Sequence, residues 1–398
     1  MGSIKVSVVI PFYNGMDYVD ETMRMITNQT LKEIEIICVD DESTDGTYDH
    51  LVEIAKTDER IIVHQQKKAN AGAARNLGMK YATGKYFVFL DSDDMYELNM
   101  LESMYESCEA ANADICICNA DQYNVETKEY VKKPHYLRTN FLPEYMPFSL
   151  EDIGKHILYF TSLVPWNKMF RADFVKEKGI SFQEIPRAND QYFCSMSLML
   201  AKRITAVQDV LIHYRVHQKD NLTATFSKTP LCSYEAMLKV KQELEACNMM
   251  QNEAVRCAFD NKFLNLLLFS LRIQNDMVAY YKLYNTMKEE GFEKLGIQLR
   301  EEDYYFDPAE YKNLVFIMQL SAEEYLFEKQ REYRETIERK NKLIQEKNIE
   351  IKSLQKTEGT LRKKEKELET IKNSKRYQTM CRIVGVWDKV SGKKKGKA

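Results

Sequence analysis

The first 120 residues alternate between short apolar runs and longer amphipathic stretches, and this alternation restricts the fold most. The apolar runs are Val6–Ile10, Ile34–Val39, Ile61–Val63, Tyr86–Leu90 and Ile115–Cys118. Helical patterns lie between them, at Tyr18–Gln29, Thr44–Lys56, Ala71–Ala82 and Asn99–Ala111. Continuous apolar strands separated by amphipathic helices predict an α/β fold, with a mostly parallel sheet that helices cover on both faces.

Polar clusters follow these predicted strands at the points where the strands end. Pro11–Asn14 follow the first strand, Asp40–Thr47 the second and Asp91–Asp94 the fourth, while Asn70–Gly78 open a helix. Ligands of Rossmann-like sheets bind beyond the carboxyl ends of the strands. We therefore expect these clusters to share one site.

The cluster Asp91–Asp94 places three carboxylates within four positions, where like charges repel unless something positive lies among them. Alternation along a strand predicts Asp91 and Asp93 on the same side, where they could hold a hard divalent cation that bridges a diphosphate. The alternative is that Asp93 or Asp94 caps a helix near Asn99. The position at a strand end favours the metal site.

Asp41 and Arg75 are further candidates in these clusters. A carboxylate at Asp41 could accept a hydrogen bond from a nucleobase N–H, such as the imide of uracil. The fork of Arg75 could bind phosphate, or it could form an ion pair with Asp40 or Asp41 that organises the site. Ser43, Thr44 or Asp45 could cap the helix that follows.

Three candidates come from the mixed segment Leu150–Thr225. Asp190 could act as a general base on an acceptor hydroxyl, or it could cap the helix that follows it. Trp166 could stack on a sugar ring or anchor core packing. His217 lies near a candidate lid, but a surface histidine needs no function.

The sequence divides into four expected domains. Residues 1–228 form the α/β domain, 229–329 a helical domain, 330–373 a coiled coil and 374–398 a basic amphipathic tail. An irregular stretch, Val131–Pro147, is expected to form a loop over the functional edge of the sheet.

The expected coiled coil carries isoleucines and leucines at a spacing of seven residues: Ile337, Ile344, Ile351, Leu354, Leu361 and Leu368. One seam position of each heptad is poorly occupied, and Gly359 weakens the helix. The pattern predicts self-association without a fixed number of chains.

The tail places Tyr377, Met380, Val384 and Trp387 on one helical face, among basic residues. Residues 374–398 contain eight basic residues and one acid. Such a helix can lie on an anionic membrane, although a solvated tail is the alternative.

Composition limits the remaining classes. The formal net charge of −3 argues against a general nucleic-acid-binding surface. The nine scattered cysteines favour a reducing compartment. No signal-peptide pattern occurs at the N-terminus, and the longest apolar run, Phe263–Leu271, is too short to span a membrane. We expect a cytoplasmic protein, with the tail on the inner face of the cell membrane.

Several motifs together resemble glycosyltransferase family 2: VSVVIPFYN, VDDESTDGT, NAGAARNLGMKYATGKYFVFLDSDD and WNKMFR, followed by Asp190. The resemblance covers about residues 5–225 and implies an inverting enzyme of the GT-A fold that uses Mn²⁺ or Mg²⁺. It implies roles as follows: donor binding by Pro11, Tyr13, Asn14, Asp41, Arg75 and Asp91, metal binding by Asp93 and Asp91, acceptor binding by Trp166, Asn167 and Lys168, and general base catalysis by Asp190.

Two positions depart from the family pattern. Glu42 stands where the family commonly has glycine, which adds charge beside the nucleoside site. Asn189 stands where glutamate is common, and the loss of that like charge could lower the pKa of Asp190. The second departure bears on acceptor preference.

The predicted function is transfer of a sugar from a nucleotide sugar, with uracil as the expected base, to a hydroxyl of a glycan or lipid-linked acceptor in cell-surface polysaccharide synthesis. The alternative is an inactive transferase-like scaffold that acts through its coiled coil. Retention of Asp41, Asp91, Asp93 and Asp190 favours the enzyme. A nucleotidyltransferase lacks support because no glycine-rich phosphate loop follows the first strand.

Overall fold

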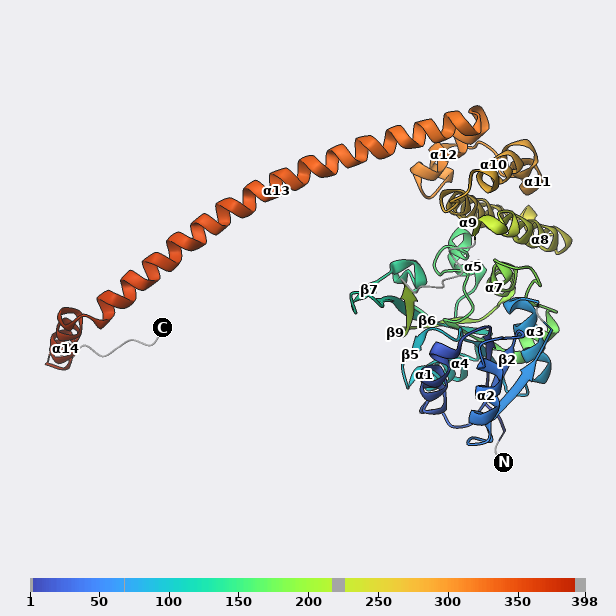
Figure 1. The fold of residues 1–398 in the computed structure, drawn as a ribbon, viewed down its shortest axis with the longest axis horizontal. Coiled ribbons are helices and arrows are strands. Elements are labelled where there is room, and N and C mark those ends of the chain that lie inside the picture. The colour runs from blue at the N-terminus through green and yellow to red at the C-terminus, as the bar shows by residue number, and fades with distance from the viewer. Residues whose placement is uncertain (1–2, 68, 217–225, 391–398) are drawn as a thin grey trace. The chain divides into compact units, whose positions relative to one another are not determined.

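The computed structural model describes residues 3–67, 69–216 and 226–390. The chain forms two compact units, Met1–Ala322 and Glu323–Ala398. The first contains a nine-stranded sheet and the helices α1 to α12, and the second consists mainly of the long helix α13 and the shorter helix α14 (Figure 1).

Four parallel strands form the first half of the sheet, in the order β3-β2-β1-β4. Their bounds are Val6–Phe12 for β1, Ile34–Asp40 for β2, Ile61–Gln65 for β3 and Tyr86–Phe89 for β4. The helices that follow them are α1 (Met16–Thr27), α2 (Thr47–Ala55), α3 (Ala71–Tyr81) and α4 (Met100–Ala111). All residues of β2 and β4 are buried, as expected for strands that helices cover on both faces. The predicted order and type of these elements are confirmed.

The second half of the sheet is mixed. β8 (Lys168–Arg171) lies between β4 and β6 (Ile115–Asn124) and is antiparallel to both. β9 (Ile204–Val216) runs parallel to β6 and pairs with the short antiparallel strand β5 (Met95–Tyr96). β7 (Tyr130–Lys132) also pairs with β6, so the irregular stretch predicted from Val131 begins inside a strand.

The strand order creates the place for a ligand. From β1 the chain moves outward to β2 and β3 on one side, and the next strand, β4, lies on the other side of β1. In open α/β sheets, a reversal of strand order of this kind at the carboxyl edge is where ligands bind. The loops that follow β1 and β4 both carry predicted site residues.

The remaining elements of the first unit are mostly helices: α5 (Leu150–Ile153), α6 (Ala172–Glu177), α7 (Asn189–Leu200), α8 (Cys232–Ala246), α9 (Glu253–Arg272), α10 (Met277–Thr286), α11 (Phe292–Leu295) and α12 (Pro308–Gln319). The last five gather at one end of this unit (Figure 1). Three of these helices begin at an N-cap side chain that accepts hydrogen bonds from backbone N–H groups: Asn252 for α9, Asp276 for α10 and Asp307 for α12. That residues 229–329 are a separate domain stays a prediction.

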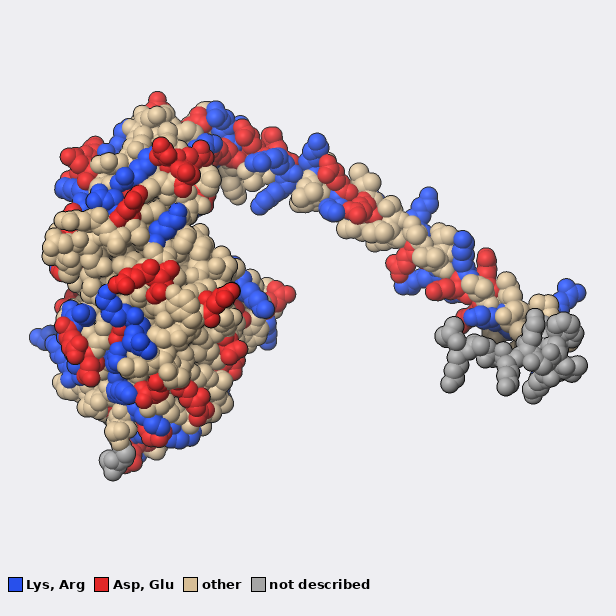
Figure 2. Space-filling model, turned by 180° about the vertical axis from the view of Figure 1, so that it is seen from behind, with Lys and Arg blue, Asp and Glu red and all other residues tan. Residues whose placement is uncertain are grey.

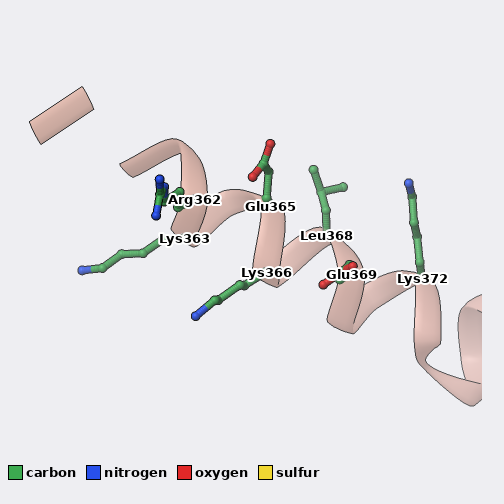
Figure 3. Close-up of a pocket in the computed structure, with 7 residues that line it drawn as sticks. All are labelled: Arg362, Lys363, Glu365, Lys366, Leu368, Glu369 and Lys372. Carbon is green, nitrogen blue, oxygen red and sulfur yellow. The ribbon is translucent and has the colours of Figure 1, made fainter. Parts of the chain in front are cut away.

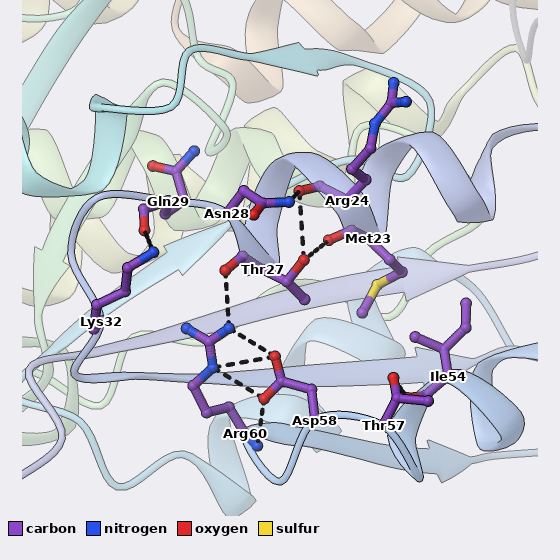
Figure 4. Close-up of polar contacts among 10 residues, drawn as sticks. All are labelled: Met23, Arg24, Thr27, Asn28, Gln29, Lys32, Ile54, Thr57, Asp58 and Arg60. Atoms are coloured by element: carbon purple, nitrogen blue, oxygen red, sulfur yellow. Dashed lines mark hydrogen bonds and ion pairs between the residues drawn. The ribbon is translucent and has the colours of Figure 1, made fainter.

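One long-range hydrogen bond, from Arg60 to Thr27, joins the C-terminal end of α1 to the residue before β3. Arg60 donates to the carbonyl of Thr27, at 2.8 Å, and forms an ion pair with Asp58, at 2.6 Å (Figure 4). Lys32 donates to the carbonyl of Gln29, at 2.7 Å. The bonds to Thr27 and Gln29 satisfy carbonyls that the end of a helix leaves without partners.

The second unit contains α13 (Ala322–Asn373) and α14 (Lys375–Val390). Acidic and basic side chains are interspersed along α13 (Figure 2). Its predicted seam residues are exposed in the single chain; Leu354, for example, is 61% exposed. Within the described ranges, every helix is too short or too polar to cross a membrane.

Candidate functional site

The loops after β1 and β2 hold each other at the carboxyl edge. The backbone N–H of Asp41 donates to the carbonyl of Phe12, at 2.8 Å. Asn14 donates its backbone N–H to Ser43 Oγ, at 2.9 Å, and its Oδ1 accepts from the N–H of Thr44, at 2.8 Å. Asn14 has a left-handed backbone, with φ of 48°, which asparagine tolerates better than most residues. These bonds bring the predicted donor segment Pro11–Asn14 beside Asp41.

Asp41 is buried and joins this pair of loops to a third. Its Oδ1 accepts hydrogen bonds from Gln66 Nε2 and from the N–H of Ala69, both at 2.8 Å. The neighbouring Asp40 accepts from Gln65 and from the N–H of Ser43, both at 3.0 Å. Gln66 was not predicted as a site residue. The signal available in the sequence was that it directly follows β3, at the carboxyl edge of the sheet.

Asp91–Asp94 form a turn rather than the end of a strand. β4 ends at Phe89, so the prediction that Asp91 and Asp93 lie on a strand is wrong, but Asp91 is close enough to raise the pKa of Asp93. The Tyr96 hydroxyl accepts from the N–H of Asp91, at 3.0 Å, and donates to its carbonyl, at 2.7 Å. Thr22 donates to the carbonyl of Ser92, at 2.7 Å. The turn is therefore held from two sides.

Arg75 supplies positive charge that offsets the repulsion among the carboxylates of the turn Asp91–Asp94. Its guanidinium forms an ion pair with Asp91, at 2.6 Å, and donates to Asn189 Oδ1, at 3.0 Å. The alternative of an ion pair with Asp40 or Asp41 is not observed, because α3 directs Arg75 toward the loop after β4, where Asp91 lies. The Arg75 side chain is 7% exposed and also lies over the ring of Phe182. The buried guanidinium of Arg75 thus joins the turn after β4 to the start of α7, which are far apart in the sequence.

Gly72 allows α3 to come close enough for this arrangement. A Cβ at Gly72 would lie 2.1 Å from the carbonyl oxygen of Gln183 and 2.9 Å from Cβ of Asn189. Asn70 caps the helix by accepting from the N–H of Ala73, at 3.0 Å. The motif that begins at Asn70 therefore starts α3, brings it against the segment before α7 and places Arg75.

Asp190 lies at the second residue of α7, next to Asn189. It is inside the helix, so the alternative that it acts as the N-cap is wrong; Ala188 holds that position. Burial raises the pKa of Asp190 to about 6, and the positive charge of Arg75 opposes the rise. The departure at Asn189 has a structural consequence: a neutral oxygen, rather than a second carboxylate, accepts the Arg75 bond.

Burial and neighbouring carboxylates disfavour the charged forms of Asp93 and Asp94 more than nearby positive charge favours them. Burial, followed by repulsion from Asp91, raises the pKa of Asp93 to about 6. Burial and the charges of Asp93 and Asp91 raise the pKa of Asp94 well above its usual value. Asp94 Oδ1 accepts from the N–H of Arg215, at 3.0 Å, while Oδ2 is buried without a hydrogen-bond partner. Capping of α4 by these acids is not observed, because Asn99 is its N-cap.

Arg215 is a site residue that sequence reasoning missed. It lies on β9, forms an ion pair with Glu21, at 2.6 Å, and its guanidinium lies over the ring of Tyr18. In this part of the chain the sequence pointed to His217, which lies outside the described residues. The available signal was an arginine beside aromatic side chains in the stretch 213–216.

The acidic turn fits a divalent cation. Its ligands would be carboxylate oxygens, which hard cations prefer, and a cation would relieve the repulsion that raises the pKa of Asp93 and Asp94. In the part of the chain that the structure describes, no group of three or more His, Cys, Asp or Glu could hold a metal ion. Substrate oxygens and water would therefore have to complete the coordination.

The residues expected to bind the acceptor are buried. Trp166 is 4% exposed and packs against Tyr136 and Tyr214. Lys168 donates to the carbonyl of Val164, at 2.8 Å, and to Asn167 Oδ1, at 2.7 Å. Asn167 donates to the carbonyl of Cys118, at 3.0 Å. These contacts are structural, and a direct role in acceptor binding stays a prediction.

Comparison with known proteins gives this geometry a context. Residues 7–177 match the model of glycosyl transferase family 2. The chain is 30% identical over 217 residues to the glycosyltransferase GlyG of Streptococcus pneumoniae, covering 53% of this chain and 70% of GlyG. It is also 30% identical over 258 residues to a poly(ribitol-phosphate) beta-glucosyltransferase of Bacillus spizizenii, covering 64% of this chain and 39% of that protein.

Other relatives are matched over part of their length. EpsH of Bacillus subtilis is 30% identical over 226 residues, and the chain spans 61% of it. Among solved structures, residues 1–349 of S. aureus TarS superpose with a TM-score of 0.61 at 21% identity, covering 81% of this chain and 89% of that one. This likeness concerns the fold, which is the GT-A fold expected from the sequence. Since the match to GlyG covers more than two thirds of that protein, the chain belongs to glycosyltransferase family 2.

Proposed function

We propose that this protein is a metal-dependent inverting glycosyltransferase that moves a sugar from a nucleotide sugar to a hydroxyl of a glycan or lipid-linked acceptor in cell-surface polysaccharide synthesis. The observation that carries the proposal is the double contact of Arg75, with Asp91 on one side and Asn189 on the other. This contact brings the proposed general base, Asp190, to the acidic turn.

The donor would bind over the loops after β1 and β2. Asp41 is held by Gln66 and Ala69, so its carboxylate is oriented before any ligand arrives. We propose that it accepts a hydrogen bond from the imide of a uracil base, with Pro11–Asn14 as the neighbouring wall. Support for a uridine nucleotide comes from TarS, which has been solved with UDP-GlcNAc, at a TM-score of 0.63.

Asp93 and Asp91 would hold Mn²⁺ or Mg²⁺ together with the diphosphate of the donor. When bound, such a cation stabilises the negative charge that develops on the leaving group. Arg75 keeps Asp91 in a fixed orientation, and Arg215 fixes Asp94 behind it. The protein's own contribution is therefore an oriented set of oxygens at one edge of the sheet.

Asp190 would accept the proton of the attacking hydroxyl. Transfer in one step forms the bond from the acceptor oxygen to the anomeric carbon while the bond to the diphosphate oxygen breaks on the opposite face. The proton moves to the Asp190 carboxylate, and the anomeric configuration inverts. No covalent enzyme intermediate is required.

Hydrolysis of nucleotide sugars tests this proposal and separates it from an inactive scaffold. The chain is incubated with a panel of UDP- and GDP-sugars, with Mn²⁺ or with a chelator. We expect release of UDP that requires the metal and is lost in Asp93→Asn. Absence of hydrolysis and of binding for every donor, in folded protein, would favour the scaffold.

Several further features belong to the same proposal. The polymeric acceptor is proposed by analogy with the Bacillus spizizenii relative, which is a glucosyltransferase of poly(ribitol-phosphate). We also propose a cytoplasmic location, with contact between the tail at 374–398 and an anionic membrane. The domain limits at 228, 329 and 373 remain part of this proposal.

A further inference from the structure

The helix α13 carries a row of exposed apolar side chains. The row consists of isoleucines in its first part and leucines in its second: Ile337, Ile344, Ile351, Leu354, Leu361 and Leu368. Each is between 42% and 61% exposed. The isoleucines recur every seven residues, and the leucines recur at the same spacing from a position three residues further on. In heptad notation the isoleucines occupy position a and the leucines position d.

Charged residues occupy the a and d positions of this seam that lack an apolar side chain, and the two halves of the seam carry opposite charges. Lys340 and Lys347 occupy position d in the isoleucine half, whereas Glu358 and Glu365 occupy position a in the leucine half. The first half of the seam is therefore basic and the second half acidic. A partner must supply acids to one half and bases to the other.

Figure 3 shows how the acidic half is arranged. Glu365, Leu368 and Lys372 project from one side of α13, and Lys363 and Lys366 point to the other side. The glutamate therefore lies in the seam with the leucine, and not on the flank of the helix.

The orientation of two helices decides which residues face each other. In a parallel pair, position a faces a and d faces d. Lys340, Lys347, Glu358 and Glu365 would then each face their own copy, which places like charges together in four layers. In an antiparallel pair, position a faces position d instead, so basic and acidic halves meet.

We propose that α13 binds a second copy of this chain as an antiparallel coiled coil, centred between Lys352 and Ser353. The facing residues in this register are Ile337 with Leu368, Ile344 with Leu361, Ile351 with Leu354, Lys340 with Glu365, and Lys347 with Glu358. Two-fold symmetry repeats each pairing. Every layer between residues 337 and 368 is then either apolar on both sides or a lysine opposite a glutamate.

Neighbouring registers lose this match. A shift of one heptad in one direction places Ile351 opposite Lys347, and a shift in the other direction places Leu354 opposite Glu358. Both shifts bury a charge against an apolar residue. The pattern thus selects one register as well as one orientation.

Ion pairs within the single helix do not remove this selectivity. Lys347 pairs with Glu350, and Glu358 pairs with Arg362, each at 2.7 Å. These side chains are more than half exposed, and exposed pairs of this kind are weak. They leave the seam charges available to a facing helix.

Charge exchange tests the orientation in the full chain, with the dimer dissociation constant measured by analytical ultracentrifugation. Lys340→Glu with Lys347→Glu should raise this constant at least about tenfold in an antiparallel pair, because glutamates then face glutamates. Adding Glu358→Lys and Glu365→Lys should restore it. In a parallel pair, every one of these variants has like charges in the same four layers, so an unchanged constant throughout would overturn the proposal.

A matched pair of substitutions tests the seam. Ile351 is 49% exposed and lies in the seam, whereas Ile349 is 70% exposed and lies outside it. Ile351→Lys should weaken association strongly, and Ile349→Lys should not. Equal effects of the two variants would show that the seam is not the interface, and a monomeric wild type up to about 100 μM would also overturn the proposal.

Cross-linking tests the register. Cys247 and Cys381, the exposed cysteines of the described residues, are first replaced by serine, and Ile344→Cys and Leu361→Cys are then combined in one chain. Mild oxidation should give a dimer whose digest contains peptide 344 joined to peptide 361. Disulfides that join 344 only to 344, and 361 only to 361, would show a parallel pair. None of these measurements depends on glycosyl transfer, so they stand apart from the test of the enzyme.

Discussion

At the scale of single residues, Asp190 is the side chain on which the proposed chemistry depends most. Asp190→Asn removes the proton acceptor while keeping the shape, so kcat should fall by about 10²–10⁴ and the KM for the donor should change little. Asp209→Asn, at an exposed position on β9, is the matched control and should leave both constants unchanged. An Asp190→Asn enzyme with the wild-type rate would remove Asp190 from the mechanism.

The pH dependence of the rate follows from the same residue. Burial raises the pKa of Asp190 to about 6, so the carboxylate is protonated below that pH and cannot accept a proton. We expect kcat to rise with pH through about 6 and then level off, when donor and metal are saturating. A kcat that stays flat from about pH 5 to 8 in the wild type would contradict the assignment.

A second carboxylate titrates nearby and has to be separated from Asp190. The pKa of Asp93 is also raised to about 6, by burial and by Asp91. Bound cation would lower this value, since an opposite charge favours the carboxylate. If the acidic limb of the pH–rate profile shifts with metal concentration, it reports the titration of Asp93. If the limb stays at the same pH, it reports the titration of Asp190.

The sequence supplied candidate site residues but not the contacts between them. Asp41 and Asp91 stood out because carboxylates beyond predicted strand ends are unusual without a ligand or a partner, whereas Arg75 and Asp190 came from helix-opening motifs and from the family resemblance. The pairing of Arg75 with Asp91 could not be predicted, since it depends on how closely α3 packs near α7. Sequence spacing carries no information on that distance.

At the scale of elements, the close approach of α3 is the feature that a small change can test. Gly72→Ala places a Cβ 2.1 Å from the Gln183 carbonyl, so α3 or the segment before α7 must move. We expect a loss of about 1–3 kcal/mol in the free energy of unfolding, measured with urea, because overpacking strains the contact. Donor affinity should fall with it, since Arg75 is displaced.

Gly359→Ala is the matched control for this substitution. Gly359 is also helical, but its Cβ would meet nothing within 4 Å. Alanine there should favour the helix by up to about 1 kcal/mol and leave donor affinity unchanged. If both variants behaved alike, helix propensity rather than packing would explain the effect at Gly72.

The tail is an element whose proposed role can be measured directly. Removal of residues 374–398 takes away eight basic residues and should reduce sedimentation with anionic vesicles to the level seen with neutral ones. Each basic residue near such a surface contributes about 1 kcal/mol, so the loss should be large and should weaken with salt. Unchanged sedimentation after the deletion would end the membrane proposal.

Prediction of elements worked where the hydrophobic period was clear. The four strands and four helices up to Ala111 were predicted in order, because buried parallel strands have continuous apolar runs. β8 and β9 were missed. β8 has four residues, and β9 mixes buried with exposed positions along its length, so neither has a distinctive period.

At the scale of the whole molecule, the two units have separable tasks. All the residues of the proposed site lie in Met1–Ala322, and the seam of α13 lies in Glu323–Ala398. A chain that ends at residue 329 should therefore keep its cooperative unfolding transition and its rate of UDP-sugar hydrolysis. It should lose dimerisation, because the row from Ile337 to Leu368 is absent.

The same truncation separates chemistry from delivery to an acceptor. Hydrolysis of a soluble donor requires only the first unit, whereas transfer to a membrane-bound or polymeric acceptor gains from two sites held in one dimer. We expect the truncated chain to hydrolyse donor at the wild-type rate per site but to glycosylate a polymeric acceptor more slowly at low enzyme concentration. Donor hydrolysis lost in a folded truncated chain would show that the second unit contributes to the site itself, which would contradict this division of tasks.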